Sequence, residues 1–164
     1  DAPDGFVLDG GEDILLDRCT SEYNAGSGFR ILTSGTTVSA SVARDNGRYG
    51  IQCGKDGCKL VNCIADSNGM AGIALLGGGL YEMYNNLAVN CGFKGDYGLL
   101  AAPGDGPELA RVRLANNIFA HNYGGVHVGS SAVMEKEDHN IYWSREDADT
   151  RIVPTRHGPG RRGP

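Results

Sequence analysis

The sequence predicts an all-β fold, a right-handed single-stranded parallel β-helix of about six turns. Two observations lead to this prediction. A Gly followed by a large apolar residue recurs every 22 to 27 residues, at Gly5-Phe6, Gly28-Phe29, Gly50-Ile51, Gly72-Ile73, Gly98-Leu99 and Gly125-Val126. A second marker keeps a similar step, at Asn24, Asn46, Asn68, Cys91 and Asn122. A repeat of about 22 residues is too short for a helix and a sheet, so the chain is expected to coil once per repeat.

Turn residues divide each repeat into three short segments that are expected to be strands. Alternation after each Gly predicts that Phe6, Leu8, Phe29 and Ile31 point inward. Two further columns are expected to point inward: Leu16, Val38, Leu60, Met83 and Leu114 form one, and Thr20, Val42, Ile64, Leu87 and Ile118 form the other. The Asn columns are expected to hydrogen-bond along the coil, because like residues stack above like in successive turns.

The two longest intervals predict loops that leave the coil, at "GGGLYEMYNN" (residues 77–86) and "AAPGDGPELA" (residues 101–110). Gly and Pro mark both segments as loops, and such loops often wall a groove. In the last repeat Glu137 takes a place where the inward column has Met or Leu. This mismatch predicts a register shift or a terminal turn.

Charge divides the chain into a coil, residues 1–150, and a basic tail rich in Pro, Gly and Arg, residues 151–164. All 20 acidic residues lie in the coil with 11 basic ones, so the coil is expected to repel nucleic acid. The tail reads as a disordered end or linker. No apolar run is long enough to cross a membrane. Because the first marker follows Asp1 by only four residues, we expect the coil to continue in a longer protein.

Five cysteines cannot all pair within one chain. Cys19 and Cys63 fall in a column of small residues and are expected to be buried thiols. Cys53 and Cys58, in "CGKDGC", flank a turn and are the candidates for a disulfide, which spacing alone does not establish. No Cys-x-x-Cys pair or His cluster indicates zinc.

The segments "DGFVLDGG", "NAGSGFRILTSG" and "ARDNGRYGIQC" resemble the catalytic module of the secreted mannuronan C-5-epimerases, which are parallel β-helix proteins. The resemblance covers roughly residues 4–78 and continues more weakly to Trp143. It implies that the chain is secreted or on the cell surface and that Asp9 is a catalytic carboxylate. The family's other catalytic residues, a Tyr and a "DPHE" segment, would precede Asp1, and its basic residues are replaced by Gly26 and Ser27.

The chemistry implied by the resemblance assigns roles to outward residues. Epimerisation or β-elimination at a uronate begins with removal of the C-5 proton, which requires that the neighbouring carboxylate be neutralised. We therefore take Asp9 and Arg30 as catalytic candidates, because an arginine pairs bidentately with a carboxylate. Gln52, Lys55 and His127 are the substrate-binding candidates. Alternation places Gln52, Ala74, Leu100 and His127 in one outward row with Arg30, with His127 at a distant subsite four turns from Arg30.

The sequence specifies no cofactor or metal. Calcium is a usual companion of the pectate-lyase-like superfamily, and its candidate ligands here are Asp4, Asp9, Glu12 and Asp13. Three functions stay open: an enzyme of uronate polysaccharides, a noncatalytic glycan-binding or structural coil, and a fragment whose open coil ends self-associate.

Overall fold

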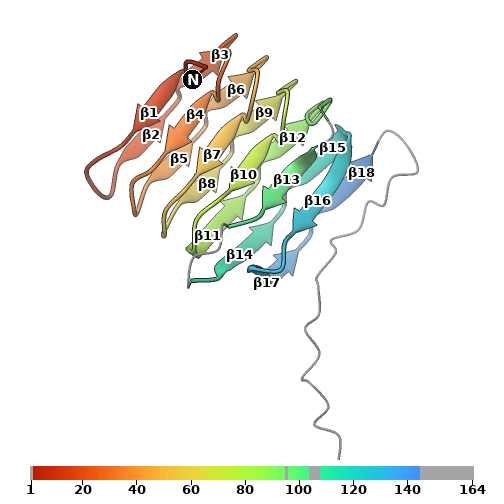
Figure 1. The fold of residues 1–164 in the computed structure, drawn as a ribbon. Coiled ribbons are helices and arrows are strands. Elements are labelled where there is room, and N and C mark those ends of the chain that lie inside the picture. Colours follow the sequence, from red (N-terminus) through yellow and green to blue (C-terminus); the bar gives the residue numbers. More distant parts are fainter. Residues whose placement is uncertain (1, 95, 104–107, 145–164) are drawn as a thin grey trace, which may run out of the picture.

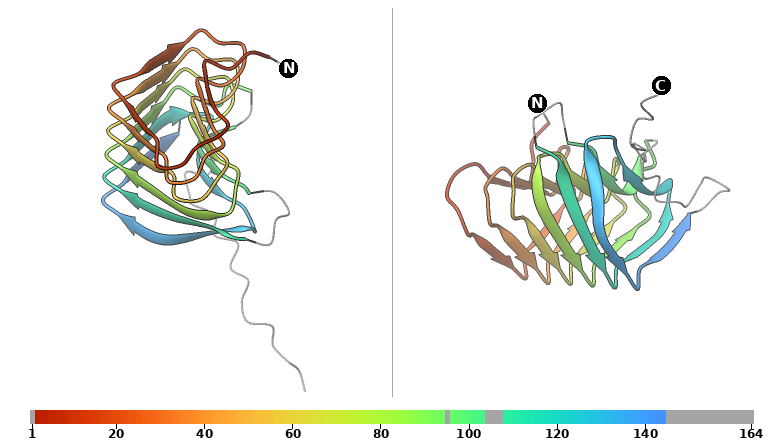
Figure 2. Two further views of the ribbon diagram at one scale, coloured as in Figure 1. Left: turned by 90° about the vertical axis from the view of Figure 1, so that its left-hand side faces the viewer. Right: turned by 90° about the horizontal axis from the view of Figure 1, so that it is seen from below.

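The computed structural model describes residues 2–94, 96–103 and 108–144, and within them the chain is a parallel β-helix of six three-stranded turns (Figure 1). Three sheets run along the coil, and every strand pairs in parallel with the strand one turn away. Seen from the side and nearly along the coil, the turns lie one above another (Figure 2). The predicted fold is therefore confirmed.

The first sheet contains β1 (Phe6–Leu8), β4 (Phe29–Ile31), β7 (Ile51–Cys53), β10 (Ile73–Leu75), β13 (Tyr97–Ala101) and β16 (Gly124–Val128). The second sheet contains β2 (Leu15–Asp17), β5 (Thr37–Ser39), β8 (Lys59–Val61), β11 (Gly79–Tyr84), β14 (Ala110–Ala115) and β17 (Ala132–Asp138). The third contains β3 (Thr20–Glu22), β6 (Val42–Arg44), β9 (Ile64–Asp66), β12 (Leu87–Val89), β15 (Ile118–Asn122) and β18 (Ile141–Ser144).

The Gly-Phe markers form one stacked column in the first sheet. Phe6 pairs in register with Phe29, and the column continues through Ile51, Ile73, Leu99 and Val126. Every member after Phe6 is at most 2% exposed. The rings of Phe6 and Phe29 are stacked with their centroids 5.1 Å apart. The predicted register and direction of this sheet are confirmed.

The second sheet also contributes its predicted column to the core, since Val38, Leu60, Met83 and Leu114 are at most 1% exposed. The prediction for the third sheet was wrong. Its column stacks as expected but points outward, and Ile64 and Ile118 are each 39% exposed. The side chains that face the core from this sheet are mostly small: Ser21, Ala43, Ala65, Ala88 and Phe119.

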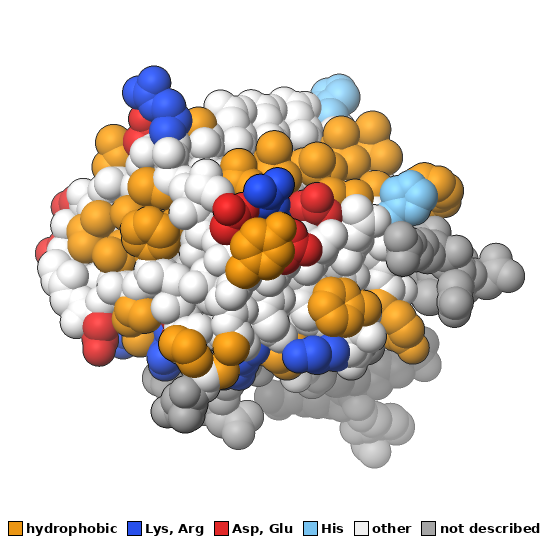
Figure 3. Space-filling model, turned by 90° about the horizontal axis from the view of Figure 1, so that it is seen from above, with side chains coloured by type: hydrophobic (Ala, Val, Ile, Leu, Met, Phe, Trp, Pro, Cys, Tyr) orange, Lys and Arg blue, Asp and Glu red, His pale blue; other side chains and the backbone are white. Residues whose placement is uncertain are grey.

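The physical reason lies one residue before each strand of the third sheet. Ser41, Cys63, Asn86 and Asn117 occupy this position and are buried, so alternation turns the next residue outward. The outward apolar residues consequently form a row across the face seen in Figure 3. Alternation correctly predicts that every second residue of a strand faces the same side. Which of the two sets faces inward is decided by the buried residue just before the strand.

Two ladders of polar side chains run along the coil, as predicted. In the first, Nδ2 of Asn24 donates to Oδ1 of Asn46 at 2.9 Å, and Nδ2 of Asn46 donates to Oδ1 of Asn68 at 3.0 Å. In the second, Nδ2 of Asn86 donates to Oδ1 of Asn117, and Nδ2 of Asn117 donates to Oδ1 of Asn140, both at 2.9 Å. These bonds satisfy buried amides that would otherwise destabilise the coil.

Each ladder follows a turn in which one residue has a positive φ. Arg18, Ala40, Asn62, Asn85, Asn116 and His139 occupy this position between the second and third sheets. Tyr23, Asp45, Ser67, Asn90 and His121 occupy it between the third and first sheets. Their φ values lie between 45° and 58°, the left-handed region in which Asn and Asp are favoured among non-glycine residues.

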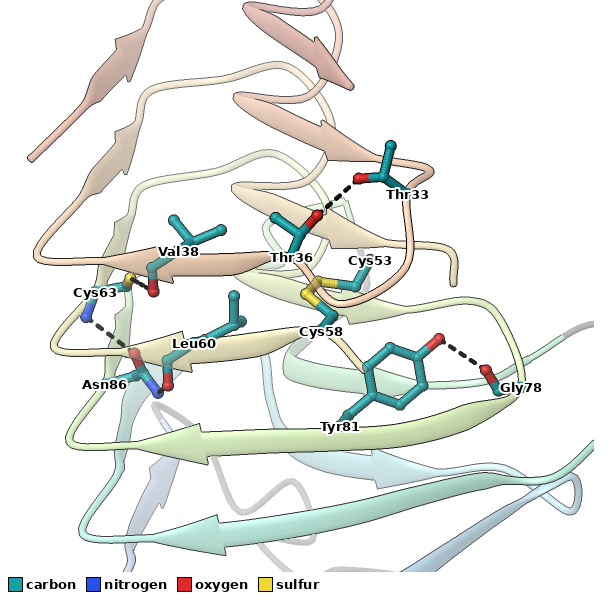
Figure 4. Close-up of a disulfide and its surroundings, with 10 residues drawn as sticks. All are labelled: Thr33, Thr36, Val38, Cys53, Cys58, Leu60, Cys63, Gly78, Tyr81 and Asn86. Carbon is teal, nitrogen blue, oxygen red and sulfur yellow. Dashed lines mark hydrogen bonds between the residues drawn. A yellow bond between two sulfur atoms is a disulfide. The ribbon is translucent and has the colours of Figure 1, made fainter. Parts of the chain in front are cut away.

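Cys53 and Cys58 form a disulfide across the turn that joins β7 to β8 (Figure 4). Both cysteines belong to the core and are at most 1% exposed. Cys63 and Cys91 are buried free thiols, whereas Cys19 is a half-buried one. Burial is therefore confirmed for Cys63 and is only partial for Cys19.

The loop predicted at residues 77–86 was wrong, because most of it is the strand β11. One of the four extra residues of this repeat lies between β10 and β11, and the other three lie between Cys91 and Gly98, where the chain makes a longer turn into β13. The second expected loop lies between β13 and β14, and its residues 104–107 lie outside the described structure. In the last turn the register between β14 and β17 shifts after Val112, as expected from Glu137.

Residues 151–164, the expected tail, lie outside the described residues. Within the described ranges, no helix is long and apolar enough to cross a membrane.

Candidate functional site

The outer face of the first sheet carries the predicted row of outward residues. The register stacks Val7, Arg30, Gln52, Ala74, Leu100 and His127 in this order. Arg30 is exposed, and Gln52 and His127 are half-buried. Ala74 is buried in a small apolar cluster with Tyr49 and Ala71. The row therefore has polar residues at Arg30, Gln52 and His127, with an apolar stretch at Ala74 and Leu100 between them.

Arg30 is held by a carboxylate, but that carboxylate belongs to Asp4. Nη1 of Arg30 lies 3.4 Å from Oδ2 of Asp4, and the main-chain N–H of Ser27 donates to Oδ1 of Asp4 at 2.6 Å. The Asp4 side chain is only 11% exposed, against 44% for Arg30. This arrangement fixes Asp4 and leaves the Arg30 side chain partly exposed, so that it can still bind an anion.

Gly26 and Ser27 occupy the positions at which the mannuronan C-5-epimerases that the sequence resembles have basic residues, and the structure shows what these positions accommodate. The hydroxyl of Ser27 donates to Oε1 of Gln52 at 3.3 Å, so Ser27 links Asp4 to Gln52. A Cβ at Gly26 would lie 2.8 Å from the carbonyl oxygens of Ala2 and Pro3. A basic side chain consequently has no room at Gly26.

Asp9 lies just beyond the end of β1 and is exposed. The preceding residue, Leu8, accepts a hydrogen bond from the N–H of Leu32, so Asp9 lies beside the end of β4 rather than beside Arg30. In the described part of the chain, the Asp9 side chain has no hydrogen-bond or ion-pair partner. The structure thus leaves this carboxylate accessible, without a second group fixed against it.

Lys55 is separated from the row. It is exposed in the turn between β7 and β8 that the Cys53–Cys58 disulfide closes. No ion pair of Lys55 occurs within the described residues. Of the five predicted site residues, only Arg30, Gln52 and His127 share one row.

His127 lies four strands from Arg30, about 19 Å at the usual strand spacing. Its ring stacks on Tyr97, with centroids 4.8 Å apart and an angle of 24° between the planes. Tyr97 also covers Gly124, where a Cβ would collide with the tyrosine ring. Tyr97 therefore accompanies His127 at the far end of the row, a contact that the sequence did not indicate.

Tyr49 is the aromatic residue nearest the apolar middle of the row and is 7% exposed. The guanidinium of Arg48 lies 5.6 Å from the centre of its ring. Burial, and to a lesser extent the carboxylate of Asp96, raises the pKa of Tyr49. The phenol therefore stays protonated at neutral pH.

The longer turn between Cys91 and Gly98 was also missed, although the sequence contains a signal for it. The next Gly marker comes four positions after Asn24, Asn46 and Asn68. It comes seven positions after Cys91, at Gly98. Phe93 in this turn is 64% exposed. Counting within the repeat, rather than between repeats, locates the insertion.

The four carboxylates considered for calcium do not assemble into a site. Across residues 2–94, 96–103 and 108–144, no three His, Cys, Asp or Glu side chains lie close enough to hold a metal ion. Asp4 is half-buried, whereas the other three candidates are exposed, and its carboxylate is paired with Arg30 instead. The structure thus offers no support for the calcium that the resemblance implied.

Comparison with known proteins adds one result. A family model described as "Right handed beta helix region" matches residues 2–91. No curated protein and no solved structure matches the chain. The match covers the first four turns, which include Asp4, Asp9, Arg30 and Gln52.

Proposed function

The chain belongs to the right-handed β-helix family, and on that premise we propose that the outer face of its first sheet binds a uronate-containing polysaccharide and acts on it as an epimerase or lyase does. One observation carries the proposal. Arg30 points outward with 44% of its side chain exposed, beside the ordered carboxylate of Asp4 and next to Gln52 in the same row. Such a cation can stabilise the charge that develops when the proton next to a uronate carboxylate is removed.

The reaction would begin with pairing between Arg30 and the uronate carboxylate. Removal of the C-5 proton leaves an electron pair that is delocalised into this carboxyl group, and the guanidinium stabilises the charge that develops. Return of a proton to the opposite face gives the epimer. Expulsion of the oxygen at C-4 instead breaks the chain and leaves an unsaturated end. Asp9 completes the proposed catalytic pair: its exposed carboxylate accepts the C-5 proton and, in the elimination, passes it to the departing C-4 oxygen.

A polymer lying along the coil would meet the remaining candidates in turn. Gln52 is one strand from Arg30 and has its amide N–H groups for sugar hydroxyls, since Oε1 accepts from Ser27. The stacked rings of Tyr97 and His127 would contact a sugar several residues away. Lys55 stands apart in its turn and would bind only a polymer that crosses the edge of the sheet.

We also propose that the chain is secreted or displayed on the cell surface. The Cys53–Cys58 disulfide supports this location, because disulfides persist mainly in oxidising compartments. The substrate would then be an extracellular polysaccharide such as alginate.

Proton NMR in deuterated water tests the proposed activity. Poly-mannuronate and a pectic polymer are each incubated with the protein, with and without calcium. Deuterium at C-5 with new guluronate signals would indicate an epimerase, and unsaturated chain ends would indicate a lyase. If neither polymer changes while oligouronates still bind, the enzymatic part of the proposal is wrong and the binding part stands.

A noncatalytic glycan-binding or structural coil is the alternative, and one observation favours it. In the described residues nothing is fixed against Asp9, so a second catalytic group is lacking there. Such a coil would associate through its ends, where the inward Phe6 is 37% exposed and strands β1 to β3 each have one unpaired edge in the described structure. Light scattering over a concentration series tests this, and a monomer at every concentration would exclude end-to-end association.

A further inference from the structure

A second surface with the features of a binding site lies on the turns that join the third sheet to the first. These turns carry an open surface hollow of about 540 Å³, which is lined by Asp45, Asn46, Gly47, Ser67, Asn90 and Phe93. The volume falls within the range of small-molecule sites, about 300 to 1,000 Å³. The hollow shares no lining residue with the row that contains Arg30, so an additional ligand could occupy it.

Three of the lining residues come from equivalent positions in successive turns. Asp45, Ser67 and Asn90 each have a φ between 53° and 55°. The N–H of Asp45 donates to the carbonyl of Asp66, and the N–H of Ser67 donates to the carbonyl of Val89, so the three turns are stacked directly. Their side chains therefore repeat at about 4.8 Å and present a carboxylate, a hydroxyl and an amide in a line.

This line of polar groups is organised by Asp66. Oδ1 of Asp66 accepts from the hydroxyl of Ser67 at 2.9 Å and from Nδ2 of Asn90 at 3.0 Å. Both side chains are thereby oriented, while the Ser67 oxygen keeps its capacity to accept a hydrogen bond. A ligand with several hydroxyl groups can both donate to and accept from such a surface.

Phe93 supplies an apolar wall to the hollow. It belongs to the inserted turn after Cys91, and its side chain is 64% exposed. The negative face of an aromatic ring attracts the weakly positive C–H groups on one side of a pyranose. An exposed ring beside a line of hydrogen-bonding groups fits a sugar, whose ring faces are apolar and whose rim carries hydroxyls.

The charges at the hollow select against an acidic sugar. Asp45 is exposed, and Asp66 lies directly behind the lining. Of the neighbouring cations, Arg44 pairs with Glu22, whereas Nζ of Lys94 donates to the carbonyl of Gly47, a lining residue, at 2.8 Å. Two carboxylates against one ammonium group leave the hollow with a net negative charge. From this geometry we propose that the hollow binds a neutral sugar unit, through Phe93, Asp45, Ser67 and Asn90. The site is independent of any reaction at the first sheet.

Titration by NMR tests this proposal with the full 164-residue protein. Neutral hexasaccharides of glucose and of xylose serve as probes, and hexa-mannuronate is the acidic comparison. We expect a neutral hexasaccharide to shift the amide signals of Asp45, Gly47, Ser67 and Phe93, and hexa-mannuronate to leave them unchanged. The absence of these shifts with both neutral probes at about 10 mM would overturn the proposal, as would shifts caused only by hexa-mannuronate.

Two variants locate the binding. Phe93→Ala should weaken the affinity for the neutral probe at least about ten-fold, because it removes the stacking surface. Leu15→Ala removes a side chain of matched exposure, 63%, from β2 in the second sheet and should leave the affinity unchanged. Equal affinities for the wild-type and Phe93→Ala proteins would assign the shifts to another site. Deuterium exchange in poly-mannuronate should be the same in both variants, which separates this test from that of the proposed enzyme.

Discussion

Arg30 is paired with Asp4, which lies two residues before β1, whereas Asp9 directly follows β1. Nη1 of Arg30 lies 3.4 Å from Oδ2 of Asp4, whose other oxygen accepts the N–H of Ser27. The pair is partly exposed, so it contributes at most about 1 kcal/mol to stability. Its main consequence is that Arg30 is held at a fixed place on the outer face, where Asp4 competes with any anionic ligand.

This competition leads to the first prediction. Arg30→Gln should weaken the binding of hexa-mannuronate about ten-fold, because a charge-assisted hydrogen bond contributes about 1.5 kcal/mol or more. Asp4→Asn should strengthen binding, because it frees the guanidinium. Isothermal titration calorimetry at low salt measures both effects. Arg18→Gln makes the same charge change at a turn residue whose side chain is 82% exposed, and its affinity should match the wild type.

Asp9 gives the second prediction. Asp9→Asn should abolish any epimerase or lyase turnover and leave the melting temperature unchanged, because the side chain is exposed and has no partner in the described structure. Glu12→Gln, an equal charge change three residues further on, serves as the control and should retain turnover. Measured rates that are equal for Asp9→Asn and the wild type would remove Asp9 from the site.

The ladders give the third prediction. Asn117 is buried, and its amide group joins Asn86 to Asn140 and donates to the carbonyl of Met83 at 2.9 Å. Asn117→Ala leaves several buried groups unpaired and should lower the free energy of unfolding by about 3 kcal/mol, measured in urea.

Its neighbour provides a matched control. Asn116 is exposed and has a φ of 57°, a conformation that glycine adopts without strain. Asn116→Gly should therefore change the stability by no more than about 0.5 kcal/mol. Equal losses for the two variants would contradict a structural role of the ladder.

The fourth prediction compares a residue of the inward column of the second sheet with a residue of the outward column of the third sheet. Leu114→Ala should destabilise the coil by about 2 to 5 kcal/mol, because Leu114 is fully buried in β14. Ile118→Ala should cost less than about 1.5 kcal/mol, because Ile118 is 39% exposed on the outer face of β15. Urea unfolding of the two variants measures the difference. A larger loss for Ile118→Ala would mean that the outer row is covered in solution.

These two residues also show how far the sequence determines the structure. The repeat predicts the fold and the stacking of Leu114 and Ile118 with their equivalents, because a coil places residues one period apart in contact. It does not predict which side Ile118 faces. That depends on Asn117, which is polar yet buried because the ladder satisfies its amide. Hydrophobicity alone therefore assigns the wrong residue to the core.

The candidate site was predictable only in part. Arg30, Gln52 and His127 were placed in one row because strand alternation and the repeat are regular. The pairing of Arg30 with Asp4 was not foreseen, because it depends on side-chain conformations in the turn before β1. The hollow at Phe93 depends on an insertion, and only the spacing between the Asn and Gly markers within one repeat reveals it.

Cys91 gives the last prediction, which concerns stability at alkaline pH. Cys91 takes the place of an asparagine in the first ladder, and its main-chain N–H donates to Oδ1 of Asn122 at 2.9 Å. Burial raises the pKa of its thiol from an ordinary value of 9.0 to about 11. Between these values the unfolded chain loses a proton that the folded chain retains, so stability is complete below pH 9 and falls as the pH rises toward 11.

The slope of this loss is at most about 1.4 kcal/mol per pH unit for one group. Urea unfolding at pH 8, 9 and 10 should show it for the wild type. Tyr81, whose pKa burial raises to about 12, adds to the loss at higher pH in all variants. Cys91→Ala should therefore be less stable than the wild type at pH 8 and should lose stability more slowly up to pH 10. Parallel curves for the two proteins would show that the Cys91 thiol is not buried in solution, and that the ladder is open at this turn.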